Sequence, residues 1–432
     1  MHEPRARAPG VCCERVPRPL LLLALLLACT PEASNETGAP DTSTGPASTT
    51  ETPTSSTTSP TSLTSTVDPG DTSTGGAVCG DGVLDPGMLC FDARRSFEAG
   101  MTPVALAVAD LDLDGLLDLV VVDIGGKRVH RLRGVGGAEF TAMEPLPSFF
   151  QPRGIVVADL DMDARPDLAV ADLGLDLLAI YLATGRPGEF ADPVPAKAGT
   201  WPRALVAADL DGDGRTDLVA ANEGSHDLGV SLADGPGSFA PVVFHPVGLA
   251  PYDLAIADFD GDGAHDLASA DKDSGTVSVL LGDGAGGFGE AVSYPVTMEP
   301  RTISVGDLDG DGRLDILIAS YTYPNLNVLL GQGDGSFAEK PGHVPTSVGM
   351  YAVVAVDLDH DGALDIVGVD HDEREVVVIR DIGPDKLPTF NRFPVGLDPV
   401  DLLVVDLDGD GARDLVTADA SSGAITVLRA DP

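Results

Sequence analysis

One ten-residue pattern, repeated seven times, constrains what this 432-residue chain can fold into. In the third copy, residues 209–218, it reads DLDGDGRTDL, with aspartate at the first, third, fifth and ninth positions and glycine at the sixth. The copies start 49 or 50 residues apart, at Asp110, Asp159, Asp209, Asp258, Asp307, Asp357 and Asp406. A period of this size indicates an array of equivalent units that bury their apolar faces against one another.

Each unit carries the same series of short apolar segments, and these favour strands over helices. Residues 104–109 (VALAVA) precede the first aspartate of the first copy, residues 118–123 (DLVVVD) follow its loop, and residues 276–282 (TVSVLLG) show the third segment in the fourth unit. Short valine- and leucine-rich runs bounded by glycine, proline and aspartate are typical of strands. Six units have a proline seven residues before the first aspartate, which predicts a strand start because proline lacks the ladder amide.

Seven units of four short strands predict an all-β fold, a seven-bladed β-propeller with four-stranded antiparallel blades. Closing the ring removes the exposed strand edges of such an array. The seventh unit ends at Pro432, before the glycine turn and phenylalanine that complete the other units. Residues 96–103 (SFEAGMTP) align with residues 392–399 (RFPVGLDP), so the segment around Phe97 is predicted to form the outer strand of the last blade.

The aspartate pattern also predicts a metal loop. Oxygen ligands at the first, third, fifth and ninth positions, with a backbone carbonyl at the seventh, suit Ca²⁺, which takes six to eight oxygens. An EF-hand starts in the same way but needs a glutamate at position 12, where the first copy has Val121, and helices rather than strands on both sides. We therefore predict up to seven structural Ca²⁺ ions in strand-flanked loops.

The predicted carboxylate ligands are four aspartates in each copy: Asp110, Asp112, Asp114 and Asp118; Asp159, Asp161, Asp163 and Asp167; Asp209, Asp211, Asp213 and Asp217; Asp258, Asp260, Asp262 and Asp266; Asp307, Asp309, Asp311 and Asp315; Asp357, Asp359, Asp361 and Asp365; Asp406, Asp408, Asp410 and Asp414. The predicted carbonyl ligands are those of Leu116, Arg165, Arg215, Ala264, Arg313, Ala363 and Ala412. The alternative is a set of solvated turns, which four crowded carboxylates disfavour.

The second copy departs from the pattern. Ala164 replaces the glycine at position 6, and Pro166 follows. Alanine resists the positive φ that position 6 of such loops commonly needs. We expect the weakest metal site, or a distorted loop, in this copy.

The repeat resembles the FG-GAP/VCBS repeat, the calcium-binding unit of the integrin α-subunit propeller. The resemblance covers about 340 residues and implies that calcium lies in the turns on one face, while ligand binds the opposite face. Seven aromatic residues are expected in turns of that opposite face: Phe149, Phe150, Trp201, Tyr252, Tyr321, Tyr323 and Tyr351. Tyrosine and tryptophan are favoured at binding hot spots. The alternative is that these rings pack between neighbouring blades.

The N-terminal region predicts export. Residues 1–28 combine arginines with a nine-residue apolar core, which is typical of a signal peptide and too short to span a bilayer. Residues 26–29 (LLAC) resemble a bacterial lipobox, which implies lipidation of Cys29 after cleavage; an ordinary secretory signal is the alternative. Residues 29–77, rich in threonine, serine and proline, predict a disordered stalk. The expected location is the cell envelope, lipid-anchored at the outer membrane or cell surface, or the secreted fraction.

Two cysteines remain between the stalk and the repeats. Cys79 and Cys90 enclose CGDGVLDPGMLC, which resembles the short disulfide repeat of secreted myxobacterial proteins and implies a disulfide clip over residues 78–93. An even pair in an exported chain favours a disulfide. Zinc is the alternative, but two cysteines without a nearby histidine make a poor site. The propeller domain is then expected over residues 94–432.

The net charge of the chain disfavours two classes of binding partner. The formal net charge of −42 argues against nucleic acid and anionic lipid as partners. We expect a monomeric module that binds an extracellular protein or polysaccharide, as in adhesion, and that is not an enzyme, because the units vary by only one residue in length and carry no recognisable catalytic motif. The alternatives are a secreted polysaccharide lyase or hydrolase and a purely structural surface protein.

Overall fold

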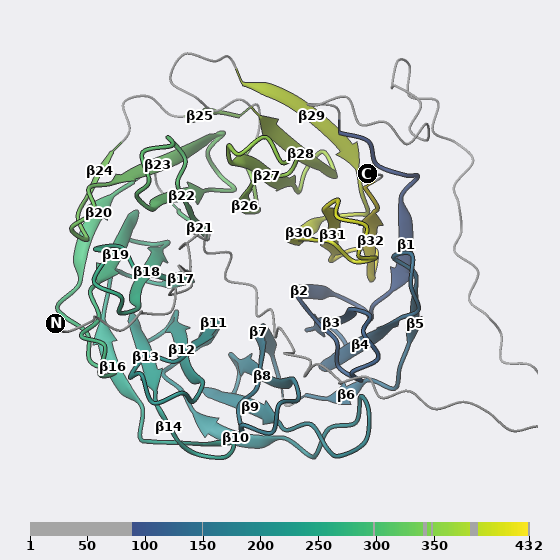
Figure 1. The fold of residues 1–432 in the computed structure, drawn as a ribbon, viewed down its shortest axis with the longest axis horizontal. Coiled ribbons are helices and arrows are strands. Elements are labelled where there is room, and N and C mark those ends of the chain that lie inside the picture. Colours follow the sequence, from purple (N-terminus) through teal and green to yellow (C-terminus); the bar gives the residue numbers. More distant parts are fainter. Residues whose placement is uncertain are drawn as a thin grey trace, which may run out of the picture.

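The computed structural model describes residues 89–148, 150–296, 299–339, 344–346, 349–380 and 388–430. Within these ranges the chain forms strands and turns, arranged as seven antiparallel sheets around a common axis (Figure 1). The prediction of a seven-bladed propeller is confirmed. The described part of the chain includes no helix long and apolar enough to cross a membrane.

The blades are numbered in chain order, and each is given from its inner strand outward. Blade 1 comprises β2 (Pro103–Ala109), β3 (Asp118–Asp123), β4 (Arg128–Gly134) and β5 (Phe140–Ala142), with β6 (Leu146–Pro147) also paired to β4. Blade 2 comprises β7 (Pro152–Ala158), β8 (Asp167–Asp172), β9 (Leu177–Tyr181) and β10 (Val194–Lys197). Blade 3 comprises β11 (Pro202–Ala208), β12 (Asp217–Asn222), β13 (Asp227–Ser231) and β16 (Val243–Pro246), with a small hairpin of β14 (Ala233–Gly235) and β15 (Ser238–Phe239).

The remaining blades follow the same plan. Blade 4 comprises β17 (Pro251–Ala257), β18 (Asp266–Asp271), β19 (Thr276–Leu280) and β20 (Val292–Pro295). Blade 5 comprises β21 (Thr302–Gly306), β22 (Asp315–Ala319), β23 (Asn325–Gly331) and β24 (Phe337–Glu339), with β25 (Val344–Pro345) paired to β23. Blade 6 comprises β26 (Ala352–Val356), β27 (Asp365–Asp370), β28 (Glu375–Arg380) and β29 (Thr389–Pro394). Blade 7 comprises β30 (Pro399–Val405), β31 (Asp414–Asp419), β32 (Ala424–Leu428) and β1 (Arg95–Glu98).

The strand pattern follows from local chemistry. Five of the inner strands, β2, β7, β11, β17 and β30, begin at the proline that predicts a strand start. The second strand of each blade is buried along its whole length, as in β3 and β8, because neighbouring blades cover both of its faces. This explains why these strands are continuous apolar runs rather than alternating ones.

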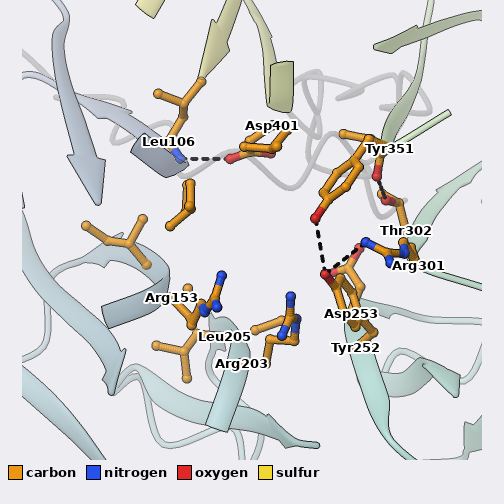
Figure 2. Close-up of a pocket in the computed structure, with 17 residues that line it drawn as sticks. Leu106, Arg153, Arg203, Leu205, Tyr252, Asp253, Arg301, Thr302, Tyr351 and Asp401 are labelled. Carbon is orange, nitrogen blue, oxygen red and sulfur yellow. Dashed lines mark hydrogen bonds between the residues drawn. The ribbon is translucent and has the colours of Figure 1, made fainter. Parts of the chain in front are cut away.

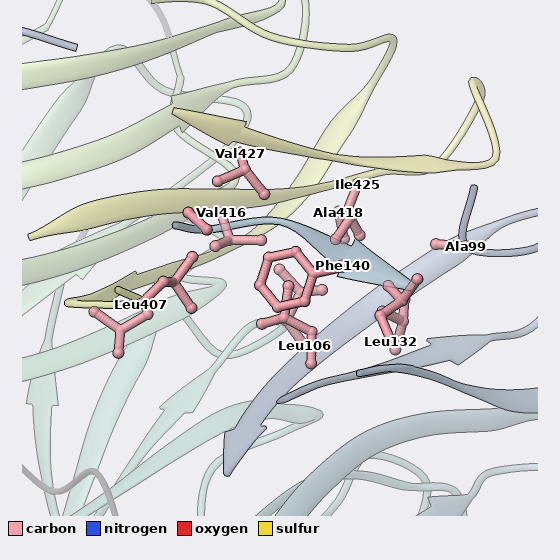
Figure 3. Packing of buried hydrophobic residues seen from close by; sticks show 13 residues of the cluster. Ala99, Leu106, Leu132, Phe140, Leu407, Val416, Ala418, Ile425 and Val427 are labelled. Carbon is pink, nitrogen blue, oxygen red and sulfur yellow. The ribbon is translucent and has the colours of Figure 1, made fainter. Parts of the chain in front are cut away.

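The hydrophobic core is divided among the spaces between blades. Seven clusters of buried residues each join two neighbouring blades, including blades 7 and 1. At that last contact, Leu106 and Phe140 of blade 1 pack against Val416 and Ile425 of blade 7 (Figure 3). Each blade is therefore stabilised by its neighbours on both sides, as expected for a repeat array.

The ring closes through the strand that comes first in the described chain. β1 pairs antiparallel with β32, which places Phe97 opposite Ile425 in blade 7. The Phe97 ring also meets the Phe140 ring of blade 1 edge-on, with centroids 5.4 Å apart. The prediction that Phe97 belongs to the outer strand of the last blade is confirmed. Pairing extends upstream to a bridge between Phe91 and Ala430.

Candidate functional site

The predicted metal loops lie between the first and second strands of the blades. In blade 3, residues 209–217 connect β11 to β12, and ligand oxygens of Asp209, Asp211 and Asp217 lie within 4.8 Å of one another. The same positions converge in blades 1 and 2, whereas in blades 4 and 5 the first, third and fifth aspartates converge, as in Asp258, Asp260 and Asp262. In each of these five loops the fold therefore brings three of the four predicted aspartates together.

Backbone amides hold the first aspartate of every loop in one orientation. In blade 3, the N–H groups of Asp213 and Gly214 donate to the two carboxylate oxygens of Asp209 at 3.2 and 2.9 Å. The corresponding pair of hydrogen bonds occurs in all seven loops. Each loop is thus preorganised by its own backbone around a carboxylate.

The ninth aspartate ties the loop to the blade. The Asp217 carboxylate accepts hydrogen bonds from the N–H groups of Leu210, in the loop, and Ala233, just after β13, at 2.8 and 2.7 Å. Burial raises the pKa of the equivalent Asp118 and Asp167 to about 6, and that of Asp365 to about 7, with neighbouring loop carboxylates adding to the rise. A nearby cation favours the charged form of such a group.

Arginines compete for some of these carboxylates, which the spacing of the aspartates does not predict. Arg133 at the end of β4 reaches Asp112 and Asp114, each at 2.7 Å. The seventh-position arginines pair with the fifth aspartate of their own loops: Arg165 with Asp163, Arg215 with Asp213 and Arg313 with Asp311. Such arginines supply part of the positive charge that crowded carboxylates need.

The donor set nevertheless fits a hard cation. Every side-chain ligand atom in these five clusters is a carboxylate oxygen, the donor type that Ca²⁺ prefers. Asp112 offers a further indication, because its Oδ1 is buried without a hydrogen-bond partner while Oδ2 pairs with Arg133. A buried oxygen with no donor calls for a compensating group. The carboxylates and the seventh-position carbonyls of these loops could hold that ion.

A second feature lies at the opposite ends of the inner strands. The residue that follows the strand-start proline, or its equivalent, comes from each blade in turn: Val104, Arg153, Arg203, Tyr252, Arg301, Tyr351 and Val400. Together with the next residue of each strand they line a cavity of about 230 Å³ on the axis (Figure 2). We call this cavity the channel mouth.

Two predicted aromatic residues line the channel mouth and a third lies beside it. Tyr252 and Tyr351 lie there with their hydroxyl oxygens 3.4 Å apart, and Arg301 sits between them (Figure 2). The Arg301 guanidinium lies 4.9 to 5.5 Å from the ring centroids of Tyr252, Tyr351 and Tyr321. Tyr252 belongs to β17 rather than to a turn, and Tyr351 immediately precedes β26. These rings line the cavity and also contact arginines of other blades, and their contact with a ligand stays a prediction.

The other predicted aromatics are dispersed. Trp201 is 52 % exposed, just before β11, and Phe150 is 45 % exposed beneath the Lys127 ammonium, which lies 4.1 Å from the ring centroid. Tyr323 is 37 % exposed. Phe149, Cys29 and Cys79 lie outside the described residues, as do the predicted signal peptide and stalk, so those predictions and the disulfide stay predictions.

The model for the FG-GAP-like repeat matches residues 110–170, 209–269, 258–318 and 307–368, just over half of the chain. The chain belongs to the FG-GAP-like repeat family. This confirms the resemblance stated from the aspartate loops, while the lipoprotein prediction remains untested.

Solved structures with a similar fold are more distant. The chain of BBS1N in complex with ARL6DN, soaked with lead, has a TM-score of 0.55 at 16 % identity, covering 77 % of this chain and 94 % of that one. The mercury-soaked form has a TM-score of 0.56 at 15 % identity, covering 78 % and 97 %. At these identities the likeness shows the propeller fold alone. The comparison with curated proteins finds no match.

The FG-GAP repeats also carry a second buried aspartate that the sequence analysis did not assign. Asp123 at the end of β3 accepts hydrogen bonds from the N–H groups of Met101 and Thr102 at 3.0 and 2.8 Å. Equivalent residues close β8, β18, β27 and β31: Asp172, Asp271, Asp370 and Asp419. The sequence signal was the recurring aspartate at the end of the second apolar run. In blades 1 and 2 its carboxylate anchors the turn that enters the inner strand.

The second FG-GAP repeat is regular despite Ala164. Ala164 adopts φ of 62°, and Met162 adopts 65°, so both take the left-handed conformation that glycine adopts in most other copies. The hydrogen bonds from Asp163 and Ala164 to Asp159 are formed at 3.1 and 2.9 Å. The loop is therefore strained rather than distorted, and a weaker metal affinity at this site stays a prediction.

Proposed function

We propose that this FG-GAP propeller is a calcium-stabilised binding module that recognises a ligand on the face opposite its metal loops. The observation that carries the proposal is that the two ends of each inner strand lead to two different sites. Its C-terminal end leads into an acidic loop such as 209–217, and its N-terminal end contributes a side chain to the channel mouth. One face is thus suited to hard cations and the other to an organic ligand.

Calcium in this proposal is structural. If each loop binds at about 0.1 mM in about 1 mM calcium, mass action stabilises the fold by roughly 1.4 kcal/mol per site, or on the order of 10 kcal/mol for seven sites. That is comparable with the whole stability of a domain. The test is thermal unfolding in calcium and in EGTA, with bound metal counted by mass spectrometry. The same melting temperature in calcium and in EGTA would contradict a structural role for calcium.

A loop variant refines this test. Asp258→Asn removes one carboxylate from the blade 4 loop, for which no arginine pair exists among the described residues. We expect one fewer bound ion and a smaller difference between the calcium and EGTA melting temperatures. The matched control is Asp273→Asn, whose side chain is 58 % exposed and lies outside the loops. Equal metal counts in the two variants would contradict the assignment.

The proposed ligand is an extracellular protein or polysaccharide, and the proposed role is adhesion or capture rather than catalysis. Tyr252 in the channel mouth and the exposed Trp201 support this, because both residue types recur at hot spots. A screen of glycans and surface proteins on the calcium-loaded chain tests it, with the Trp201→Ala, Tyr252→Ala double variant expected to lose capture. Capture by the variant at wild-type strength would place the site elsewhere.

We further propose that the propeller is a monomer held at the cell surface by lipid on Cys29. The support is the lipobox-like sequence before a stalk that would lift the propeller from the membrane. Cys29→Ser should move the protein from the membrane fraction to the soluble fraction, because a lipid chain is what holds it. An unchanged fractionation pattern would argue against the anchor.

A further inference from the structure

The channel mouth concentrates positive charge in a strongly acidic protein. Only 26 lysines and arginines oppose 68 acidic residues in the chain, yet arginines from blades 2, 3 and 5 converge on this one cavity. Figure 2 shows Arg153 and Arg203 side by side with Arg301 across from them. Like charges repel when gathered in this way, so the arrangement needs a compensating group.

Of the three arginines, only Arg203 has an ion pair among the described residues. Arg203 pairs with Glu223 at 2.8 Å, and its guanidinium lies 3.4 Å from the ring centroid of Tyr252. No ion pair among the described residues involves Arg153 or Arg301. Arg301 donates through Nη1 to the Tyr252 hydroxyl at 3.3 Å, and the Nε of each arginine is buried without a hydrogen-bond partner. A buried donor that lacks an acceptor is costly unless a ligand supplies one.

Among the described residues, neither acid of the channel mouth forms an ion pair with Arg153 or Arg301. Asp253 accepts hydrogen bonds from the N–H groups of Leu254 and Ile303, and Asp401 accepts them from Leu402 and Leu106. Burial raises the pKa of Asp253 to about 6 and of Asp401 to about 7, so Asp401 is partly protonated at neutral pH while Asp253 keeps most of its charge. Both carboxylates therefore serve the backbone of neighbouring blades.

We propose that the channel mouth binds the carboxylate group of a small organic acid between Arg153 and Arg301, with the Tyr252 and Tyr351 hydroxyls beside it. The planar guanidinium group presents paired N–H donors that match a carboxylate. The cavity of about 230 Å³ is small for a ligand pocket, so it suits a single acidic group or one sugar acid. The net charge of −42 repels polyanions at long range, which favours a ligand with one negative charge. This inference rests on the proposed binding role of that face.

The test is calorimetric titration of the calcium-loaded full chain with sodium galacturonate, and with galactose as the neutral match. Galacturonate should bind while galactose should not. Arg153→Gln should weaken galacturonate binding roughly 10- to 100-fold, because a hydrogen bond to a charged group is lost. Arg186→Gln, at an exposed arginine on an outer turn, should leave it unchanged.

The outcomes separate this inference from the proposed function. Equal binding of galactose and galacturonate, or equal affinity of Arg153→Gln and wild type, would overturn the carboxylate site even if surface ligands are captured. If Arg153→Gln melts below wild type, Arg301→Lys provides the second variant, because it keeps the charge but loses the paired donors. Absence of any binding by small acids, with intact calcium dependence, would overturn this inference and leave the propeller module standing.

Discussion

Asp401 offers a prediction whose size follows from the structure. Its carboxylate accepts the Leu106 N–H at 2.7 Å across the contact between blades 7 and 1. Burial raises its pKa to about 7, and the charge of Asp253 across the channel adds to the rise. Between about pH 4 and pH 7 the folded state therefore binds more protons than the unfolded state, so stability falls as pH rises through this window.

The variant Asp401→Asn removes this linkage while it keeps a carbonyl oxygen for the Leu106 N–H. One pKa unit corresponds to about 1.4 kcal/mol, so wild type should lose up to about 3 kcal/mol between pH 5 and pH 8 that the variant does not lose. The carboxylate borders the open channel mouth, and solvent screening there makes this an upper bound. We expect the variant to gain roughly 1 to 3 kcal/mol relative to wild type over the window.

The assay is equilibrium urea unfolding in saturating calcium at pH 5, 6, 7 and 8. The difference between variant and wild type is compared across pH, which cancels the pH dependence shared by the metal loops. Asp253→Asn, with a pKa of about 6 in wild type, should give a smaller gain, and the exposed Asp273→Asn should give none. A difference for Asp401→Asn that stays constant from pH 5 to pH 8 would refute the reasoning.

Two further predictions concern backbone geometry. Gly396→Ala places a Cβ 2.3 Å from Oδ2 of the buried Asp419, so it should lower the free energy of unfolding by about 1 to 3 kcal/mol. The control is Gly289→Ala, whose Cβ would have its nearest contact at 3.6 Å and should change the free energy of unfolding little. Equal losses for the two variants in urea unfolding would contradict the clash. Ala164→Gly relieves a left-handed alanine and should raise stability in EGTA by about 0.5 to 1 kcal/mol, whereas Ala412→Gly, where φ is not positive, should lower it. A loss of thermal stability in Ala164→Gly would mean that the loop strain is absent.

The sequence repeat allows the ring and its closure to be predicted, whereas features that differ between blades, such as the channel mouth, cannot be predicted from it. Each aspartate loop recurs at a fixed spacing, so the period alone placed the strands and the metal loops, and the alignment around Phe97 placed β1 in blade 7. The channel mouth depends on the residue after the strand-start proline, which is arginine, tyrosine or valine in different blades. The repeat marks this position in each unit, but its residue type varies, so the chemistry of the cavity exists only after seven strands meet on one axis.

Other differences have a local physical cause. Arg133 lies 15 residues after the last aspartate of its loop, and only the pairing of β3 with β4 brings it to Asp112 and Asp114. Position 4 of the loops takes a positive φ even at Leu113 and Met162, where the sequence offers no glycine to indicate it. In both cases the feature, an ion pair or a backbone conformation, follows from the hydrogen-bonded blade and cannot be read from the local sequence alone.

The pairing of β1 with β32 gives the chain an order of events during synthesis. β1 leaves the ribosome before any other described strand, yet its partner, residues Ala424–Leu428, is among the last to emerge. Until blade 7 is made, Leu106 and Phe140 of blade 1 lack the blade 7 residues of their cluster, so we expect that side of blade 1 to stay partly exposed. Contacts of such long sequence separation form slowly. A polypeptide truncated just before residue 424 would thus lack β32 of the last blade and also part of the surface that covers the first blade.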